Sequence, residues 1–135
     1  MPAKLSPKVI ELLNRPVLAH VVTLMKDGSP QVTPVWVDTD GENVFINTEM
    51  QRLKARNMKR DPRVALSITD KVDDHYTLFI RGVVTDISAK EGMAHINKLS
   101  RKYTGKDLYT SNRPGDIRVK ITIRPEKVSG SSTTR

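Results

Sequence analysis

The sequence predicts one mainly β domain, a small antiparallel barrel with peripheral helices. Three observations favour this class: about six short extended runs, turn residues between most of them, and only two or three segments with helical character. At 135 residues the chain has the length of a single domain, and no linker separates two hydrophobic clusters. We assign residues 1–128 to this domain and the polar residues 129–135 to a flexible tail.

The first third of the chain predicts a helix followed by a meander of three strands. Ser6 precedes Pro7 as an N-cap precedes a proline at the first helical position, and this helix should end near residues 14–16. Extended runs with turn residues between them then predict strands at 17–25, 31–38 and 43–48. Pro34 lies inside the second run and cannot donate to a ladder, so we expect it at an edge, at a bulge or facing a ligand.

The remaining segments alternate between helix and strand. Residues 49–61 favour a basic helix that Pro62 stops, and the two runs after it predict long strands at 63–69 and 76–87. Gly82 inside the second of these indicates a bulge or bend. Ser88 and Glu91 have the spacing of a capping box before a helix that reaches Thr104, and an alternating run at 117–123 closes the sheet.

Composition excludes several classes of protein. The chain has no cysteine, so disulfides, thiolate metal sites and a cysteine nucleophile are ruled out. No leader peptide or membrane-spanning run is evident, and we expect a soluble cytoplasmic protein with no membrane partner. The net charge of +8 attracts anions in general. Aromatic residues are only 4% of the chain and no nucleic-acid motif occurs, so the sequence disfavours nucleic acid as a partner.

The densest polar signal is the basic segment that opens the helix at 49–61. Free backbone N–H groups at a helix start, together with the side chains of Arg52 and Lys54, would hold a phosphate. The same charges could instead form a solvated helix face. Asn47 and Thr48 precede this helix and could bind the same ligand or cap the helix, and Trp36 could stack on a ring or fill a core.

No other catalytic signature stands out. The three histidines, His20, His75 and His95, show no metal-ligand spacing, and we predict no metal site. The chain also lacks a nucleophile elbow, a P-loop and a dinucleotide-binding glycine motif.

Several segments resemble one family when taken in order. The turn and strand from Gly28 to Trp36, the pair Asn47 and Thr48, and the helix and strand from Lys54 to Ser67 are similar to segments of the flavin and deazaflavin oxidoreductase superfamily. They resemble in particular its pyridoxamine 5′-phosphate oxidase-like branch that uses coenzyme F420. The resemblance continues through residues 81–84, 95–105 and 118–123, and so spans nearly the whole chain.

This resemblance implies a split β-barrel like that of FMN-binding proteins, in a homodimer whose two cofactor clefts are each built from both chains. Residues 52–57 would cradle the cofactor phosphate beside Thr48, and two further groups would line the ring system and the approach of the other strand. The cofactor-binding residues implied in this way are Gln31, Thr33, Pro34, Thr48, Arg52, Leu53, Lys54, Ala55, Arg56, Asn57, His75, Tyr76 and Thr77.

The activity implied is hydride transfer from reduced coenzyme F420 to a small electron-poor organic substrate, with no catalytic acid or base identified. The chain ends without the longer C-terminal region of classical pyridoxamine phosphate oxidases, so the sequence disfavours that particular activity. One alternative is an FMN-binding oxidase or flavin-binding protein of the same fold. A second is a non-enzymatic basic module that binds a cofactor, a tetrapyrrole or nucleic acid.

Overall fold

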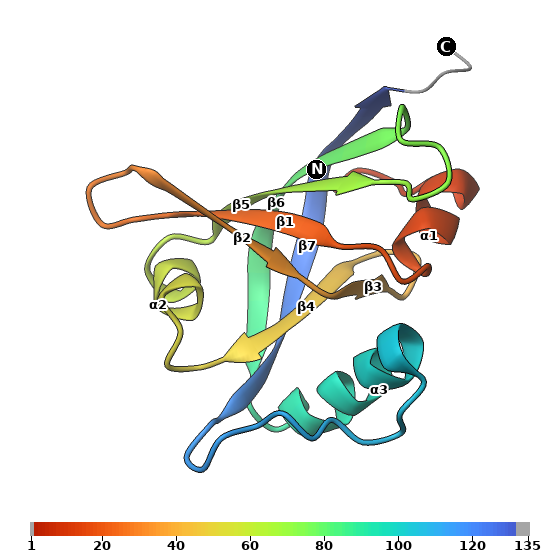
Figure 1. Cartoon of the computed structure of the whole chain (residues 1–135). Coiled ribbons are helices and arrows are strands. Elements are labelled where there is room, and N and C mark those ends of the chain that lie inside the picture. Colours follow the sequence, from red (N-terminus) through yellow and green to blue (C-terminus); the bar gives the residue numbers. More distant parts are fainter. Residues whose placement is uncertain (1, 132–135) are drawn as a thin grey trace.

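A computed structural model describes residues 2–131, which form one curled antiparallel sheet of seven strands with three helices around it (Figure 1). The helices are α1 (Pro7–Leu13), α2 (Leu53–Arg60) and α3 (Gly92–Thr104). The strands are β1 (Ala19–Leu24), β2 (Pro30–Val35), β3 (Val37–Thr39), β4 (Val44–Glu49), β5 (Arg63–Thr69), β6 (Thr77–Ser88) and β7 (Arg118–Ser131). This arrangement confirms the split β-barrel predicted from the sequence.

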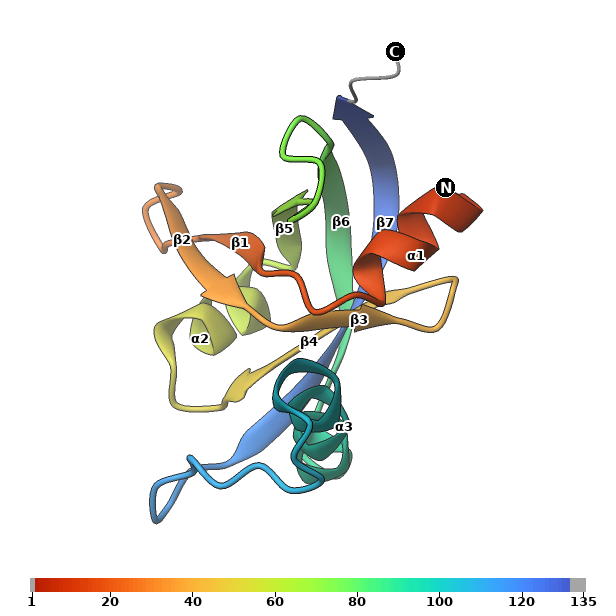
Figure 2. The ribbon, with the colours of Figure 1, turned by 45° about the vertical axis from the view of Figure 1, so that its right-hand side comes forward.

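The two edges of the sheet meet at Trp36. The strand order is β2-β1-β5-β6-β7-β4-β3, so the two edge strands β2 and β3 are consecutive in sequence and only Trp36 separates them. From this point β2 and β4 diverge, and helix α2 lies across the open end between them (Figures 1 and 2). The barrel is therefore split between β2 and β4, and the split is widest near α2.

The core fills the inside of the curl. Along the strands, buried residues that face the inside of the curl alternate with more exposed ones. Examples of the buried residues are Val21 in β1, Leu66 in β5 and Ile121 in β7. Helix α1 contributes Leu12 and Leu13 to this core and helix α2 contributes Met58, so the two helices pack against different parts of it. Helix α1 starts at the predicted cap, where the Ser6 hydroxyl accepts a hydrogen bond of 3.3 Å from the Val9 amide.

Strand β4 is buried along its whole length because both of its faces are covered. Val44 and Ile46 belong to the core inside the curl. Helix α3 covers the other face, where Phe45 meets the ring of His95 and the Asn47 amide bonds to the helix. This double coverage places polar side chains of β4 in a low-dielectric environment.

The structure corrects three details of the predicted elements. The run at 31–38 is not one strand of a meander, because the chain leaves β2 at Trp36 and pairs as β3 with β4. Helix α2 begins at Leu53 and not at residue 49, since β4 continues to Glu49 and pairs there with β7.

The third correction concerns the C-terminal tail. Residues 129–131 pair with β6 as the last part of β7, so the flexible tail predicted from 129 does not include them. The rest of that predicted tail, 132–135, lies outside the described residues. The bulge predicted at Gly82 is confirmed by a register shift between Arg81 and Gly82, where the backbone of β7 approaches so closely that a Cβ would clash with it. Within residues 2–131 no helix has the length and apolar character needed to cross a membrane.

Candidate cofactor-binding site

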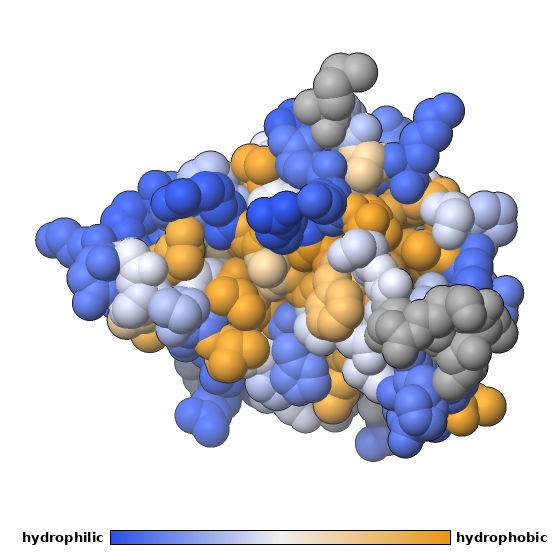
Figure 3. Space-filling view, turned by 90° about the horizontal axis from the view of Figure 1, so that it is seen from above, coloured by the Kyte–Doolittle hydropathy of each residue, from blue (hydrophilic) through white to orange (hydrophobic). Residues whose placement is uncertain are grey.

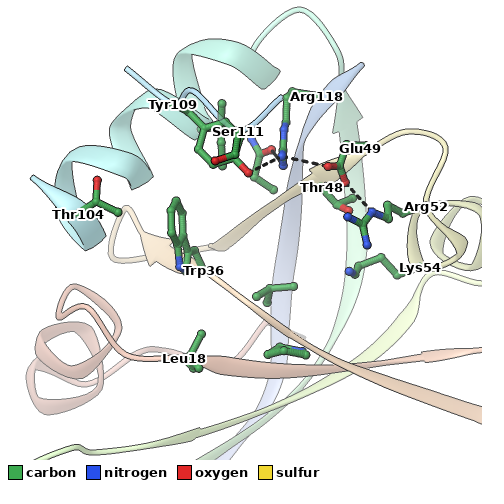
Figure 4. A pocket seen from close by; sticks show the side chains of 14 residues that line it. Leu18, Trp36, Thr48, Glu49, Arg52, Lys54, Thr104, Tyr109, Ser111 and Arg118 are labelled. Carbon is green, nitrogen blue, oxygen red and sulfur yellow. Dashed lines mark hydrogen bonds and ion pairs between the residues drawn. The ribbon is translucent and has the colours of Figure 1, made fainter. Parts of the chain in front are cut away.

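A cavity of about 490 Å³ opens where β2 and β4 diverge. Its walls come from the start of β1, the end of β2, the end of β4, the start of α2, helix α3, the loop after it and the start of β7 (Figure 4). The lining residues are Leu18, Pro34, Val35, Trp36, Asn47, Thr48, Glu49, Arg52, Lys54, Ile96, Thr104, Tyr109, Ser111 and Arg118. Basic side chains and aromatic side chains therefore share one cavity.

Lys54 supplies a buried positive charge at one end of this cavity. The residue is 9% exposed, and among the described residues its side chain has no hydrogen bond or ion pair. Burial lowers its pKa from the ordinary lysine value, the neighbouring charges of Arg52 and Arg118 lower it further, and Glu49 opposes the shift. A buried ammonium group without a partner favours an anionic ligand, because such a ligand would replace the hydration that burial removes.

The start of helix α2 adds donors to the same end. Arg52 is the N-cap residue, and its side chain makes no capping hydrogen bond to the backbone, so the first N–H groups of the helix are not capped by it. Thr48 ends β4 beside this helix start, is buried and lines the cavity. An anion bound here would meet the partial positive charge of the helix terminus as well as two cationic side chains.

Glu49 connects this end of the cavity to Arg118. One carboxylate oxygen accepts a hydrogen bond of 2.8 Å from Arg52 Nε, and the other accepts one of 3.1 Å from Arg118 Nη2. The dashed lines in Figure 4 follow this chain from Arg52 through Glu49 to Arg118 and Tyr109. Because one carboxylate faces two guanidinium groups and Lys54 lies near them, the cavity retains a net positive charge.

The opposite end of the cavity is aromatic. Trp36 stacks on Tyr103 with ring centroids 4.8 Å apart, and Tyr109 meets Trp36 edge-on at 6.0 Å. The Tyr103 hydroxyl accepts a bond of 2.9 Å from the Val37 amide and donates one of 2.6 Å to the Val17 carbonyl, and burial raises its pKa to about 12. Helix α3 thus holds the split of the barrel in place beside Trp36.

Lys102 strengthens this closure. Its ammonium group donates to the carbonyls of Leu13 and Val37, and burial lowers its pKa to about 8 despite the attraction of Asp38. One bond goes to the end of helix α1 and the other to the start of strand β3. Lys102 is therefore a cation used for structure, unlike Lys54.

Four of the residues predicted for the cofactor line this cavity together. They are Pro34, Thr48, Arg52 and Lys54. Pro34 lies on β2, which is an edge strand as its missing N–H required. The structure thus brings together the basic residues derived from the helix start and the two strand residues implied by the resemblance.

Six other predicted residues lie near α2 and β2 but do not line the cavity. Asn57 donates to the Thr23 hydroxyl at 3.0 Å, and Thr23 in turn donates to Gln31 at 3.2 Å, so these side chains form a polar contact beneath the helix. The Thr33 hydroxyl is buried and has no hydrogen-bond partner among the described residues. The remaining three are Leu53 and Arg56, which are exposed, and Ala55, which is buried.

The last three predicted residues lie on the hairpin between β5 and β6, and none of them lines the cavity. Tyr76 is buried and packs under the Lys8 ammonium, 4.5 Å from its ring centroid. The side chain of His75 is exposed and lies within 4.8 Å of the Asp73 and Asp74 carboxylates. Exposed groups of this kind are common without a metal, and we assign no ion to them.

Sequence reasoning missed the part of the cavity wall formed by Glu49 and Arg118. Arg118 was read only as part of a closing strand, because no local pattern reveals that its guanidinium turns toward β4. Tyr109 lies in a polar loop whose sequence could also indicate a solvent-exposed surface. The sequence allows Trp36 either to fill a core or to stack on a ligand, and in the structure it lines the cavity.

Comparison with known proteins gives one family match. A family model described as pyridoxamine 5′-phosphate oxidase matches residues 5–131. The search among curated proteins gives no match.

Among solved structures, one named F420 reductase is 36% identical, with a TM-score of 0.78 over 88% of this chain and 94% of that chain. A conserved hypothetical protein from Mycobacterium tuberculosis is 22% identical, with a TM-score of 0.74 over 97% and 86% of the two chains. General stress protein 26 from Bacillus anthracis is 17% identical, with a TM-score of 0.68 over 92% and 91%. The last two show likeness of fold alone.

Proposed function

The chain belongs to the pyridoxamine 5′-phosphate oxidase family of split-barrel oxidoreductases, and we propose that it binds a flavin-type cofactor in the cavity between β2 and β4. We propose further that the cofactor is coenzyme F420, and that the reduced cofactor gives a hydride to a small electron-poor organic substrate. The hydride chemistry is supplied by the cofactor, while the protein supplies binding, orientation and charge.

The observation that carries this proposal is the ammonium group of Lys54, which has no hydrogen bond or ion pair within residues 2–131. It lines the cavity beside Arg52, at the uncapped start of α2. A phosphate group fits these donors, because an oxyanion can accept from backbone N–H groups and from cationic side chains at once. Thr48 adds a hydroxyl at the same end of the cavity. We propose these residues as the phosphate site.

The other lining residues support a planar group in the remainder of the cavity. Pro34, Val35 and Leu18 provide apolar surface, and Trp36 provides an aromatic surface that is braced by Tyr103. Apolar walls with a few convergent polar groups are typical of cofactor sites. In this arrangement the protein binds the cofactor by its charged end and excludes water from the planar end.

Two facts favour coenzyme F420 over FMN. The structure named F420 reductase is 36% identical over most of both chains, whereas the other neighbours described above are less than 25% identical. The chain carries a net charge of +8, which suits the long anionic tail of a deazaflavin better than the shorter FMN. FMN remains the second candidate because the same phosphate site serves either cofactor.

We also propose that the protein is a homodimer. The outer face of β1, β2, β5 and β6 carries an apolar depression of about 500 Å³, and Val32 and Phe79 there are 60% and 47% exposed. Seen from above, hydrophobic side chains are also exposed between the tip of the β1–β2 hairpin and helix α1 (Figure 3). Burial of such surface against a second copy would stabilise a dimer. In that dimer the β5–β6 hairpin of one protomer, which carries His75 and Tyr76, would reach the cofactor cleft of the other protomer.

A fluorescence titration of the purified protein with coenzyme F420, and in parallel with FMN at the same ionic strength, tests the proposal. We expect micromolar or tighter binding of coenzyme F420 and weaker binding of FMN. A preference for FMN would assign the protein to the flavin-dependent alternative. Binding of neither, together with a salt-dependent affinity for DNA, would favour a basic binding module instead.

A further inference from the structure

A continuous chain of buried polar groups runs from Asp38 to Arg118. Asp38 Oδ1 lies 2.9 Å from His95 Nε2, and His95 Nδ1 lies 3.1 Å from Asn47 Nδ2. Asn47 Oδ1 lies 3.4 Å from Arg118 Nη1. The four side chains come from β3, α3, β4 and β7, and each residue is at most 7% exposed. Only the last two line the cavity.

The chemistry of Arg118 fixes the direction of every bond in this chain. A guanidinium group can only donate, so the Asn47 oxygen must face it and the Asn47 amide nitrogen must face His95. That nitrogen donates one hydrogen to the Gly92 carbonyl at 2.9 Å and the other to His95. His95 Nδ1 is therefore an acceptor, and its Nε2 carries the hydrogen that is donated to Asp38.

Asp38 completes the chain as its terminal acceptor. Burial raises the pKa of this carboxyl group, whereas its interactions with His95 and the charges of Lys98 and Lys102 lower it, and the pKa lies below the ordinary value. Asp38 is therefore a carboxylate that accepts the Nε2 hydrogen. It fixes the orientation of the imidazole ring, and the ring fixes the amide of Asn47.

At its other end the chain of polar groups contacts a loop. Residues 105–117 contain no helix or strand, and two of their side chains bind Arg118: Tyr109 through its hydroxyl at 2.9 Å and Asn112 through its amide oxygen at 2.8 Å. The Arg118 guanidinium also packs on the Tyr109 ring at 4.6 Å. Tyr109 and Ser111 of this loop form the cavity wall next to Trp36.

We propose that His95 is a positioning residue for the cavity: through Asn47 it sets the orientation of Arg118, which holds loop 105–117 as the aromatic wall. The ring of Tyr109 lies at the Trp36 end of the cavity, opposite the proposed phosphate site of Lys54. The catalytic part of the proposal rests on the proposed function, and there this wall holds the electron acceptor against the cofactor ring.

Two matched substitutions separate this role from simple packing. In His95→Asn the amide reaches the place of Nδ1, so the bond to Asn47 survives and the bond to Asp38 is lost. In His95→Gln the amide reaches the place of Nε2, so the bond to Asp38 survives and the bond to Asn47 is lost. Both variants remove the same ring. If His95 acts through Asn47, only the glutamine variant disturbs the wall.

The first readouts need no cofactor. We expect the Tyr109 amide, which donates to Asn97 at 2.8 Å, to exchange its hydrogen roughly tenfold faster in His95→Gln and at the wild-type rate in His95→Asn. The emission of Trp36, the single tryptophan, should change in the glutamine variant alone. Equal changes in both variants, or a larger change in His95→Asn, would overturn the proposal.

The second readout uses the loaded enzyme with menadione as the electron acceptor. In His95→Gln we expect the KM for menadione to rise about tenfold or more while the Kd for coenzyme F420 stays within about twofold of wild type. A loss of cofactor affinity with an unchanged KM would contradict the assignment of the wall to the acceptor. If the wild-type protein binds no cofactor, the proposed function fails, and the exchange and emission readouts still decide the role of His95.

A measurement on the wild-type protein covers the case in which a variant does not fold. Nitrogen-15 spectra of the His95 ring should show an unprotonated Nδ1 and a protonated Nε2. A hydrogen on Nδ1 would reverse the direction of the chain and would contradict the proposal.

Discussion

Lys54 and Arg118 are buried cations of the same cavity, and they differ in their partners. Arg118 is 7% exposed and donates to Glu49, Asn47, Asn112 and Tyr109. Lys54 is 9% exposed and has no hydrogen bond or ion pair within residues 2–131. Burial of an unpaired charge costs stability, whereas a charge with several hydrogen bonds stabilises the groups around it. The contrast indicates that Arg118 builds the site and that Lys54 binds the ligand.

The contrast predicts that Arg118→Ala has the largest effect on the stability of the protein. Removing this guanidinium leaves the buried Glu49 carboxylate with Arg52 as its remaining partner, and we expect a loss of about 3 kcal/mol in the free energy of unfolding. Urea unfolding monitored by circular dichroism measures it. A loss below about 1 kcal/mol would show that Arg118 is not structural and would contradict the distinction drawn between Arg118 and Lys54.

Tyr103→Phe tests the closure of the barrel beside the same wall. The phenyl ring keeps the stacking on Trp36, but the buried Val37 amide and Val17 carbonyl each lose a hydrogen bond. We expect a loss of about 2 kcal/mol, within the range for buried groups that are left unpaired. Thermal unfolding compared with wild type checks this value, and an unchanged melting temperature would mean that the hydroxyl is not needed at the split.

Lys54→Met should behave in the opposite way to Arg118→Ala. The substitution removes an unpaired charge and keeps an apolar stem of similar length, so the free protein should be as stable as wild type or more stable. A loss of stability comparable to that of Arg118→Ala would show that Lys54 has a structural role.

The difference in stability between the wild type and Lys54→Met should change with pH in one direction. The pKa of Lys54 is lowered in the folded protein, so between that value and the ordinary lysine pKa the unfolded chain binds more protons. Wild-type stability should therefore rise relative to Lys54→Met between neutral pH and about pH 10. Urea unfolding at both pH values measures the difference, and a relative fall would contradict the direction of the shift.

The smallest effect is expected for Arg56→Ala. Arg56 belongs to the same basic segment as Lys54, but its side chain is exposed and does not line the cavity. We expect a change in stability within about 0.5 kcal/mol and a cofactor Kd within about twofold of wild type. A weakening comparable to that of a Lys54 variant would mean that the phosphate site extends along the outside of α2.

Much of the fold could be predicted from the sequence because local signals agreed with one another. Strand β5 occupies the predicted residues 63–69, and helix α1 starts at its predicted serine cap. The break at Trp36 could not be predicted, because Val35 and Val37 both favour extended structure. Val35 and Val37 belong to different strands only because the sheet curls until its two edge strands lie on either side of Trp36.

The candidate site could be predicted only where its residues share a local feature. Arg52 and Lys54 were found because a helix start concentrates donors in one short segment. Arg118 was missed because its guanidinium reaches Glu49 of β4 only through the pairing of β4 with β7, and Tyr109 is held at the cavity by that same guanidinium. His95 was read only as a histidine without metal-ligand spacing, since its partners Asp38 and Asn47 lie far from it in sequence.

The central claim is that Lys54 binds the anionic group of a flavin-type cofactor. The most direct measurement is the Kd of coenzyme F420 for the wild type, Lys54→Ala and the control Arg56→Ala under one buffer condition. We predict that Lys54→Ala weakens binding by about 1.5–3 kcal/mol, the range for losing a hydrogen bond to a charged group, and that the control does not. An unchanged Kd in Lys54→Ala would remove Lys54 from the site and contradict the account.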